Sequence, residues 1–169
     1  VCYQYINREK DVDRWNSHYQ DIYLVGLTQH QQHTDQTPPS LANTIMSEFP
    51  EVLSAGRVMP YSYGSFPIFG KETALVKNVV LADAEAAAMF EIRTTDGKLF
   101  ITAPNTSATI ANSAISTLLF ADDAMPTLQQ PIQLKTQAWN QDFYETFYGV
   151  AENRKPSYLD FDLLLVKPI

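Results

Sequence analysis

Apolar residues recur along the chain at two spacings, which predict a mixture of strands and short helices. In residues 21–29, DIYLVGLTQ, both faces of an extended chain would be apolar: Ile22, Leu24 and Gly26 on one face, and Tyr23, Val25 and Leu27 on the other. Apolar character on both faces is typical of a strand that is covered from two sides. We therefore expect a central strand here, after a polar lead-in over residues 1–20.

The next apolar pattern has a helical period. Leu41, Ile45 and Phe49 follow one another at four-residue spacing and would form one stripe on a helix. Thr37 is a suitable N-cap before two prolines, and Pro50 would end the helix. The sequence thus predicts a helix between Thr37 and Pro50.

Strand patterns return at residues 55–63 and 73–82, the second of which is rich in valine and leucine. Asp83 follows directly and is a suitable N-cap for a short alanine-rich helix that closes with Met89 and Phe90.

The stretch TTDGK, residues 94–98, has the composition of a turn, and the pattern restarts after it. Asn105 and Thr106 predict the cap of a helix over residues 107–120, in which Ile110, Ala114 and Leu118 form a stripe. Three further strands are expected at residues 131–138, 142–151 and 158–166. Strands and helices alternate irregularly, so we predict an α+β fold with a mixed sheet and flanking helices.

Composition limits the classes of function. The 169 residues suit one domain or two small subdomains, and the net charge of −7 with scattered basic residues argues against nucleic acid as a partner. Cys2 is the only cysteine, so no internal disulfide is expected. No apolar stretch is long enough to span a bilayer, and no signal peptide is recognisable. Because the chain starts at Val1, we expect a piece whose targeting segments lie outside it.

Few residue pairs suggest chemistry. His30 and His33 lie three apart, but they enter a loop and no third ligand is fixed by spacing, so we expect solvated histidines and no metal site. Asp160 and Asp162 would share one face of the last strand, as paired acid/base carboxylates do, although solvated carboxylates on a half-buried strand give the same alternation. Asp122 and Asp123 fit a solvated loop after a helix.

Phosphate-binding and nucleophile motifs are missing from the sequence, and we expect no catalytic residue and no cofactor. The stretch YSYGSFPIFG, residues 61–70, is more informative because its rings stand among glycines and a proline. On a loop, these rings would form a surface that contacts a partner or substrate; alternatively they cover the edge of the core. The candidate contact residues are Tyr61, Tyr63, Phe66 and Phe69.

Three stretches, taken in order, resemble one family. They are DVDRWNSHYQDIYLV with PPSLANTIMSEFPEVLSAGRV, then NVVLADAEAAAMFEI, and finally PNTSATIANSAISTLLFADDAMP with FYETFYGVAENRKPSYLDFDLLL. In their order and spacing they are similar to the extracytoplasmic domain of MacB-like ABC transporter permeases, which are related to the FtsX-like permeases. The resemblance spans nearly all of the chain.

The resemblance implies a two-part domain between two transmembrane helices. Residues 1–95 and 143–169 would form a discontinuous membrane-proximal subdomain, and residues 96–142 a smaller inserted α/β subdomain. Such a domain is not an enzyme. It lies on the periplasmic face of the bacterial inner membrane and transmits ATP-driven motion for efflux or extraction of a hydrophobic or peptide substrate.

The resemblance also implies partners: a second permease copy, an ATP-binding subunit or domain, and, in some relatives, a periplasmic adaptor protein. The flanking helices would hold the domain at the membrane. Two alternatives from other classes stay open at this point. One is an extracytoplasmic ligand-sensing domain of a membrane receptor kinase, and the other is a small hydrolase that uses Asp160 and Asp162.

Overall fold

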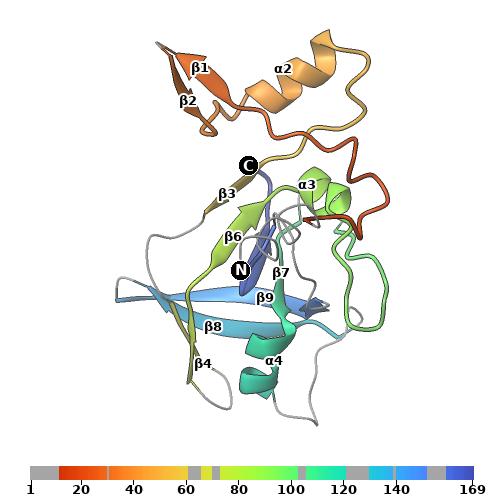
Figure 1. Ribbon diagram of the computed structural model, residues 1–169. Helices are drawn as coiled ribbons and strands as arrows, with labels where there is room; N and C mark the ends of the chain where they lie inside the picture. The colour runs from red at the N-terminus through yellow and green to blue at the C-terminus, as the bar shows by residue number, and fades with distance from the viewer. Residues whose placement is uncertain are drawn as a thin grey trace, which may run out of the picture.

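The fold is built on one large mixed sheet. The computed structural model describes residues 12–29, 31–60, 66–69, 73–102, 106–120, 130–138, 140–151 and 159–169. Within these ranges, eight strands form a sheet in the order β3-β6-β10-β7-β9-β8-β4-β5, and a separate hairpin pairs β1 with β2 (Figure 1). Parallel and antiparallel pairs both occur in the large sheet, and helices accompany it, so the predicted α+β class is confirmed.

The elements have the following bounds. The strands are β1 Leu27–Gln29, β2 Gln32–Thr34, β3 Val58–Pro60, β4 Phe66–Phe69, β5 Thr73–Val76, β6 Val79–Ala82, β7 Ala108–Asn112, β8 Ile132–Ala138, β9 Gln141–Ala151 and β10 Leu163–Val166. The helices are α2 Leu41–Glu48, α3 Ala84–Met89 and α4 Ser113–Phe120.

The strand β10 lies inside the sheet, parallel to β6 and antiparallel to β7. Its side chains alternate between two apolar cores: Leu163 and Leu165 join one, while Leu164 and Val166 join the other. All four are buried, which explains why the sequence here is an unbroken apolar run rather than an apolar–polar alternation.

One helix contributes side chains to each of these cores. From α3, Ala86 and Ala87 pack with Leu164 and Val166, and from α4, Ile115 and Leu119 pack with Leu163 and Leu165. The prediction for α3 is confirmed in detail, because the carboxylate of Asp83 accepts the N–H of Ala86 at 2.9 Å.

The prediction for residues 107–120 is half wrong. Residues 108–112 form β7, and the helix α4 starts only at Ser113. The cap is Asn112, whose Oδ1 accepts the N–H of Ile115 at 2.9 Å, rather than the expected Asn105 and Thr106. The helical spacing was real, but pairing with β10 on one side and β9 on the other makes the first half a strand.

The expected central strand at residues 21–29 is also wrong. Residues 22–26 form neither helix nor strand, and only Leu27–Gln29 pair, in the β1–β2 hairpin outside the large sheet. Tyr23, Leu24 and Val25 are exposed. We call residues 22–57 the arm, since this stretch holds the hairpin and α2 and leads into β3, and Figure 1 shows it at one end of the molecule.

Other boundaries moved by a few residues. The helix α2 begins after Ser40 rather than Thr37, and it ends at Glu48 before Pro50 as expected. The strand expected at 73–82 is two strands separated by Lys77 and Asn78, and the last strand begins at Leu163 instead of residue 158.

The proposed division into 1–95 with 143–169 and an inserted 96–142 stays a prediction. Strands β7 and β8, from the expected insertion, lie in the same sheet as β6 and β10, from the expected membrane-proximal part. Strand pairing alone does not define which part would fold independently.

Candidate functional site

The aromatic stretch is only partly described. Tyr61 and Tyr63 lie outside the described residues. Phe66 and Phe69 form the two ends of β4, which pairs with β5 along its whole length and with β8 at Ile68 and Phe69. The expected loop is therefore wrong for Phe66–Phe69, which belong to a strand. Whether these four residues contact a partner stays a prediction.

The histidine pair is also described only in part, because His30 lies outside the described residues. His33 lies opposite Thr28 in the β1–β2 hairpin, and its Nδ1 is 2.8 Å from the Thr28 hydroxyl. The part of the chain that the structure describes holds no group of three potential metal-ligating side chains. Asp122 and Asp123 lie outside that part.

The two aspartates near the end of the chain have different surroundings. Asp160 is exposed, whereas the carboxylate of Asp162 accepts the backbone N–H groups of Lys77 at 3.0 Å and Asn78 at 3.1 Å. Asn112 donates its side-chain amide to the same carboxylate at 3.2 Å. Asp162 therefore holds three chain segments together, which is a structural role.

The arm is the surface that sequence analysis missed. Among its described residues none is buried, and this includes every residue of α2. Several large apolar side chains are exposed along it and along the adjoining β3: Tyr23, Leu24, Val25, Leu27, Met46, Phe49, Leu53, Val58 and Met59. Single exposed apolar residues are normal, but so many on one stretch of chain make the arm the candidate binding surface.

The arm is also poor in charge. Its charged residues are Asp35, Glu48, Glu51 and Arg57, and Asp35 is the only one between residues 22 and 47. The helix α2 has eight residues and no side-chain cap hydrogen bond. A helix this short has little stability of its own. The arm therefore depends on its junction with the rest of the domain, and its few charged residues add little to its solubility.

Close backbone packing forms that junction. A Cβ atom added at Gly56 would lie 2.4 Å from the backbone nitrogen of Ala86, so only glycine allows the arm to approach α3 this closely. The next residue, Arg57, pairs with Asp83 through backbone and side chain. The Arg57 N–H donates to Asp83 Oδ2 at 3.0 Å, the Asp83 N–H donates to the Arg57 carbonyl at 3.1 Å, and Nε lies 3.2 Å from Oδ2.

The Arg57 guanidinium extends the junction in two directions. It donates to the carbonyl of Ile169 and, at 3.4 Å, to the side-chain oxygen of Asn43 on α2. The C-terminal residue of the described chain, α2 of the arm and the cap of α3 thus share one arginine. Figure 1 likewise shows the C terminus beside the arm.

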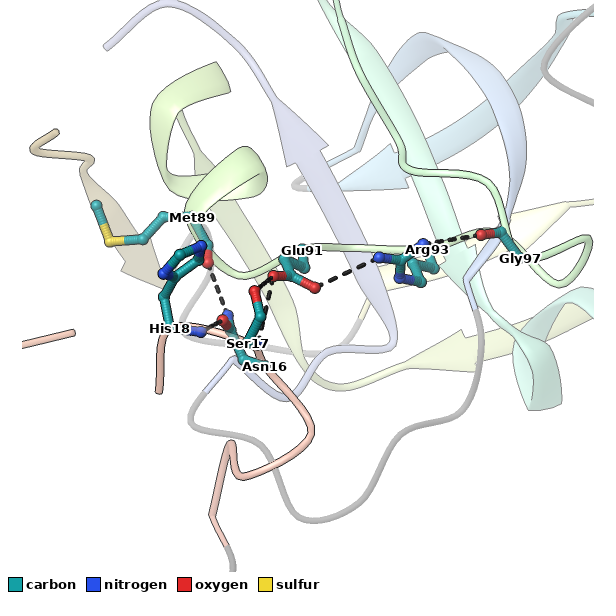
Figure 2. Close-up of polar contacts among 7 residues, drawn as sticks. All are labelled: Asn16, Ser17, His18, Met89, Glu91, Arg93 and Gly97. Atoms are coloured by element: carbon teal, nitrogen blue, oxygen red, sulfur yellow. Dashed lines mark hydrogen bonds and ion pairs between the residues drawn. The ribbon is translucent and has the colours of Figure 1, made fainter. Parts of the chain in front are cut away.

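A second set of polar contacts fastens the lead-in residues to the end of α3, as Figure 2 shows. Asn16 is buried, donates its amide to the carbonyl of Met89 at 2.8 Å, and accepts the N–H of His18 at 2.8 Å. Ser17 donates its hydroxyl to Glu91, and Arg93 donates to the other oxygen of that carboxylate at 3.4 Å.

These contacts alter the acidity of Glu91. The hydroxyl of Ser17 is the main cause that lowers the pKa of Glu91 below its ordinary value of 4.5, with smaller contributions from Arg93. Burial acts in the opposite direction but is outweighed. Because the surroundings favour the charged form, the carboxylate keeps its role as hydrogen-bond acceptor for Ser17 and Arg93 and so anchors the lead-in.

One signal in the sequence could have indicated the arm. Residues 22–47 combine apolar side chains with a single charged residue, Asp35, and this composition fits an interface as well as it fits a core. An apolar pattern shows that a segment would gain free energy if its side chains left water. It does not show whether the same chain or another molecule would bury them.

Comparisons with known proteins give the fold. No protein-family model matches the chain, and no curated protein matches it. Among the described residues, no helix is long and apolar enough to cross a membrane. One solved structure, "a domain of a putative Permease protein from Porphyromonas gingivalis", is similar with a TM-score of 0.60 and 18% identity, over 80% of this chain and 54% of that one. This chain therefore spans about half the length of that domain, and it shares that domain's fold.

Proposed function

We propose that this chain is the periplasmic domain of an ABC transporter permease of the MacB-like and FtsX-like kind, without catalytic residues of its own. It transmits motion driven by ATP hydrolysis elsewhere to a hydrophobic or peptide substrate outside the inner membrane. Its partners are a second permease copy, an ATP-binding subunit or domain and, in one variant of this arrangement, a periplasmic adaptor.

The observation that carries the proposal is the fold shared with the permease domain over 80% of this chain. The position of β10 supports it. This strand lies between β6 and β7 within the sheet, and Lys167 continues the pairing by donating its N–H to Ala82 at 3.0 Å. If a membrane helix follows residue 169, its displacement reaches the middle of the domain directly.

The first experiment tests topology in the full-length protein. In a Cys2→Ser background, a Tyr144→Cys substitution places a thiol at a position that is 63% exposed. A membrane-impermeant maleimide should label it from the periplasm in intact cells. Labelling only after the inner membrane is broken contradicts the proposal, as does a full-length sequence without apolar spans of about 20 residues on both sides.

A second experiment tests transmission of motion. A flexible glycine–serine insertion after Ile169 should leave ATP hydrolysis by the transporter intact and lower transport, because a flexible linker absorbs displacement. The same insertion at Asn140, in the turn between β8 and β9, is the matched control and should leave both intact. Equal transport in both variants contradicts the proposed mechanism, and ATP hydrolysis by the purified chain contradicts the absence of catalysis.

One observation favours the second candidate, a ligand-sensing domain of a receptor kinase. That hypothesis requires one continuous sheet with a ligand pocket, and the eight described strands meet the first of these two requirements. Purification of the full-length protein separates the two hypotheses. A co-purifying or fused ATPase that drives transport supports the permease, whereas a histidine or serine kinase domain on the same chain supports the sensor.

A further inference from the structure

We propose that the arm, residues 22–57, rests on the outer surface of the lipid bilayer through its exposed apolar side chains. This inference extends the proposed function, because it assumes that a membrane helix follows the end of the chain. The surface that the arm contacts is the zwitterionic interface of the bilayer and not a protein.

The first step is the apolar surface itself. Tyr23 is 80% exposed, Leu24 63% and Leu53 93%, and Met46 and Phe49 are exposed on or beside α2. Tyrosine and tryptophan favour the membrane interface, since the ring is apolar and one end carries a polar group. Leucine, methionine and phenylalanine gain free energy when they leave water for the acyl boundary.

The second step is the charge of the arm. The arm carries three acidic residues and one basic residue, and the whole chain has a net charge of −7. A protein or lipid surface that recognises charge would find almost none between residues 22 and 47, where Asp35 stands alone. An uncharged apolar surface suits a zwitterionic bilayer, and the acidic chain as a whole is repelled by anionic lipid.

The third step is position. Arg57 contacts both the carbonyl of Ile169 and the side chain of Asn43 on α2, so the end of the chain and the arm are joined through one residue. Figure 1 shows the C terminus beside the arm and away from α4. A membrane helix that continues from residue 169 would therefore bring the arm, rather than the α4 end, close to the bilayer.

The test is co-sedimentation of the 169-residue chain with phosphatidylcholine vesicles. We expect binding that is unchanged at high salt and weaker when anionic lipid is added. The double variant Tyr23→Ser, Leu24→Ser should bind at least about tenfold more weakly, because each change removes apolar area that leaves water on binding. The matched control is Ile101→Ser, Tyr144→Ser, which alters side chains that are 76% and 63% exposed outside the arm and should bind like the unmodified chain.

Each other outcome overturns the inference. Binding absent from the unmodified chain, or lost equally in both double variants, excludes the arm as a lipid contact. A third outcome is that the unmodified chain self-associates without binding vesicles and that the double variant Tyr23→Ser, Leu24→Ser does not self-associate. This outcome would assign the arm to contact with a second copy of the chain. Since these side chains are exposed, both variants should fold, and Leu53→Ser provides an independent single change. Failed vesicle binding with correct periplasmic labelling rejects only this inference, whereas failed labelling rejects the proposed function.

Discussion

Asn112 donates its side-chain amide to the carboxylate of Asp162 at 3.2 Å, and the two residues lie 50 positions apart in the sequence. The other carboxylate oxygen accepts the N–H groups of Lys77 and Asn78. Asn112 also caps α4. One carboxylate therefore fixes the turn between β5 and β6, the corner between β7 and α4, and the start of β10.

We expect Asp162→Ala to lower the free energy of unfolding by about 2 kcal/mol, because it leaves several donors without their acceptor. Urea denaturation measures this change. Asp160→Ala is the control: its carboxylate is exposed, and we expect a change within about 0.5 kcal/mol. Equal effects of the two substitutions would show that Asp162 is not a structural anchor.

Glu91 makes stability depend on pH. Its pKa in the folded chain is lowered, so its contribution is present above the ordinary value of 4.5 and is lost as pH falls through the lower folded value. Glu91→Gln should therefore be less stable than the unmodified chain at pH 7, and this difference should shrink below about pH 4.

Asp96 titrates in the same acidic range, since Lys98 and Thr94 lower its pKa to about 2. For this reason the quantity to measure is the difference in free energy of unfolding between the Glu91→Gln variant and the unmodified chain at each pH. Asp96→Asn serves as a parallel control. Ser17→Ala removes the main cause of the Glu91 shift and should reproduce much of the effect of Glu91→Gln. A difference that does not vary with pH would contradict the assignment.

Thr109 offers a stabilising substitution. Its hydroxyl is buried in β7 and has no hydrogen-bond partner among the residues described. Thr109→Val keeps the shape and removes an unpaired polar group, so we expect the free energy of unfolding to rise by about 1 kcal/mol. Thr94→Val is the matched control: the Thr94 hydroxyl is also buried but has two acceptors within reach, the Asp96 carboxylate and, at 3.1 Å, the carbonyl of Lys98, so its loss should destabilise. Destabilisation by both would indicate that the Thr109 hydroxyl has a partner.

Gly56→Ala tests the junction of the arm. The added methyl group would meet the backbone of Ala86 at 2.4–2.5 Å, and backbone atoms cannot move away as a flexible side chain can. We expect a loss of about 2 kcal/mol in the free energy of unfolding and faster proteolysis within the arm. Ser54→Ala, at a nearby exposed position, should change neither. If Gly56→Ala changed neither the free energy of unfolding nor the rate of proteolysis, the arm would not be packed against α3.

The sequence predicted best the elements that short-range chemistry determines. Asp83 caps α3 because its carboxylate reaches an N–H three residues along the same chain, and no distant residue is needed. Residues 108–112 were assigned to a helix because Ile110 and Ala114 have helical spacing, yet pairing with β10 and β9 makes these residues a strand. Those partners lie dozens of positions away, and spacing carries no information about them.

The candidate surface was the least predictable part. Tyr23 and Leu24 were expected to be covered by their own chain, and both are exposed. Their apolar character suggested burial, but whether a segment is buried depends on the long-range arrangement of the chain, which the local pattern does not contain. Sequence reasoning therefore favoured the aromatic rings near Phe66, whereas the structure directs attention to the arm.

The position of β10 has a mechanical consequence. Its neighbours β6 and β7 are hydrogen-bonded along both of its edges, and its four side chains anchor in two cores. A pull along the strand from residue 169 acts on both rows of hydrogen bonds in shear, so the bonds must rupture together instead of opening one after another as in a zipper. A force applied at this end should therefore move the domain as a rigid body at loads well below those that would pull the strand out of the sheet.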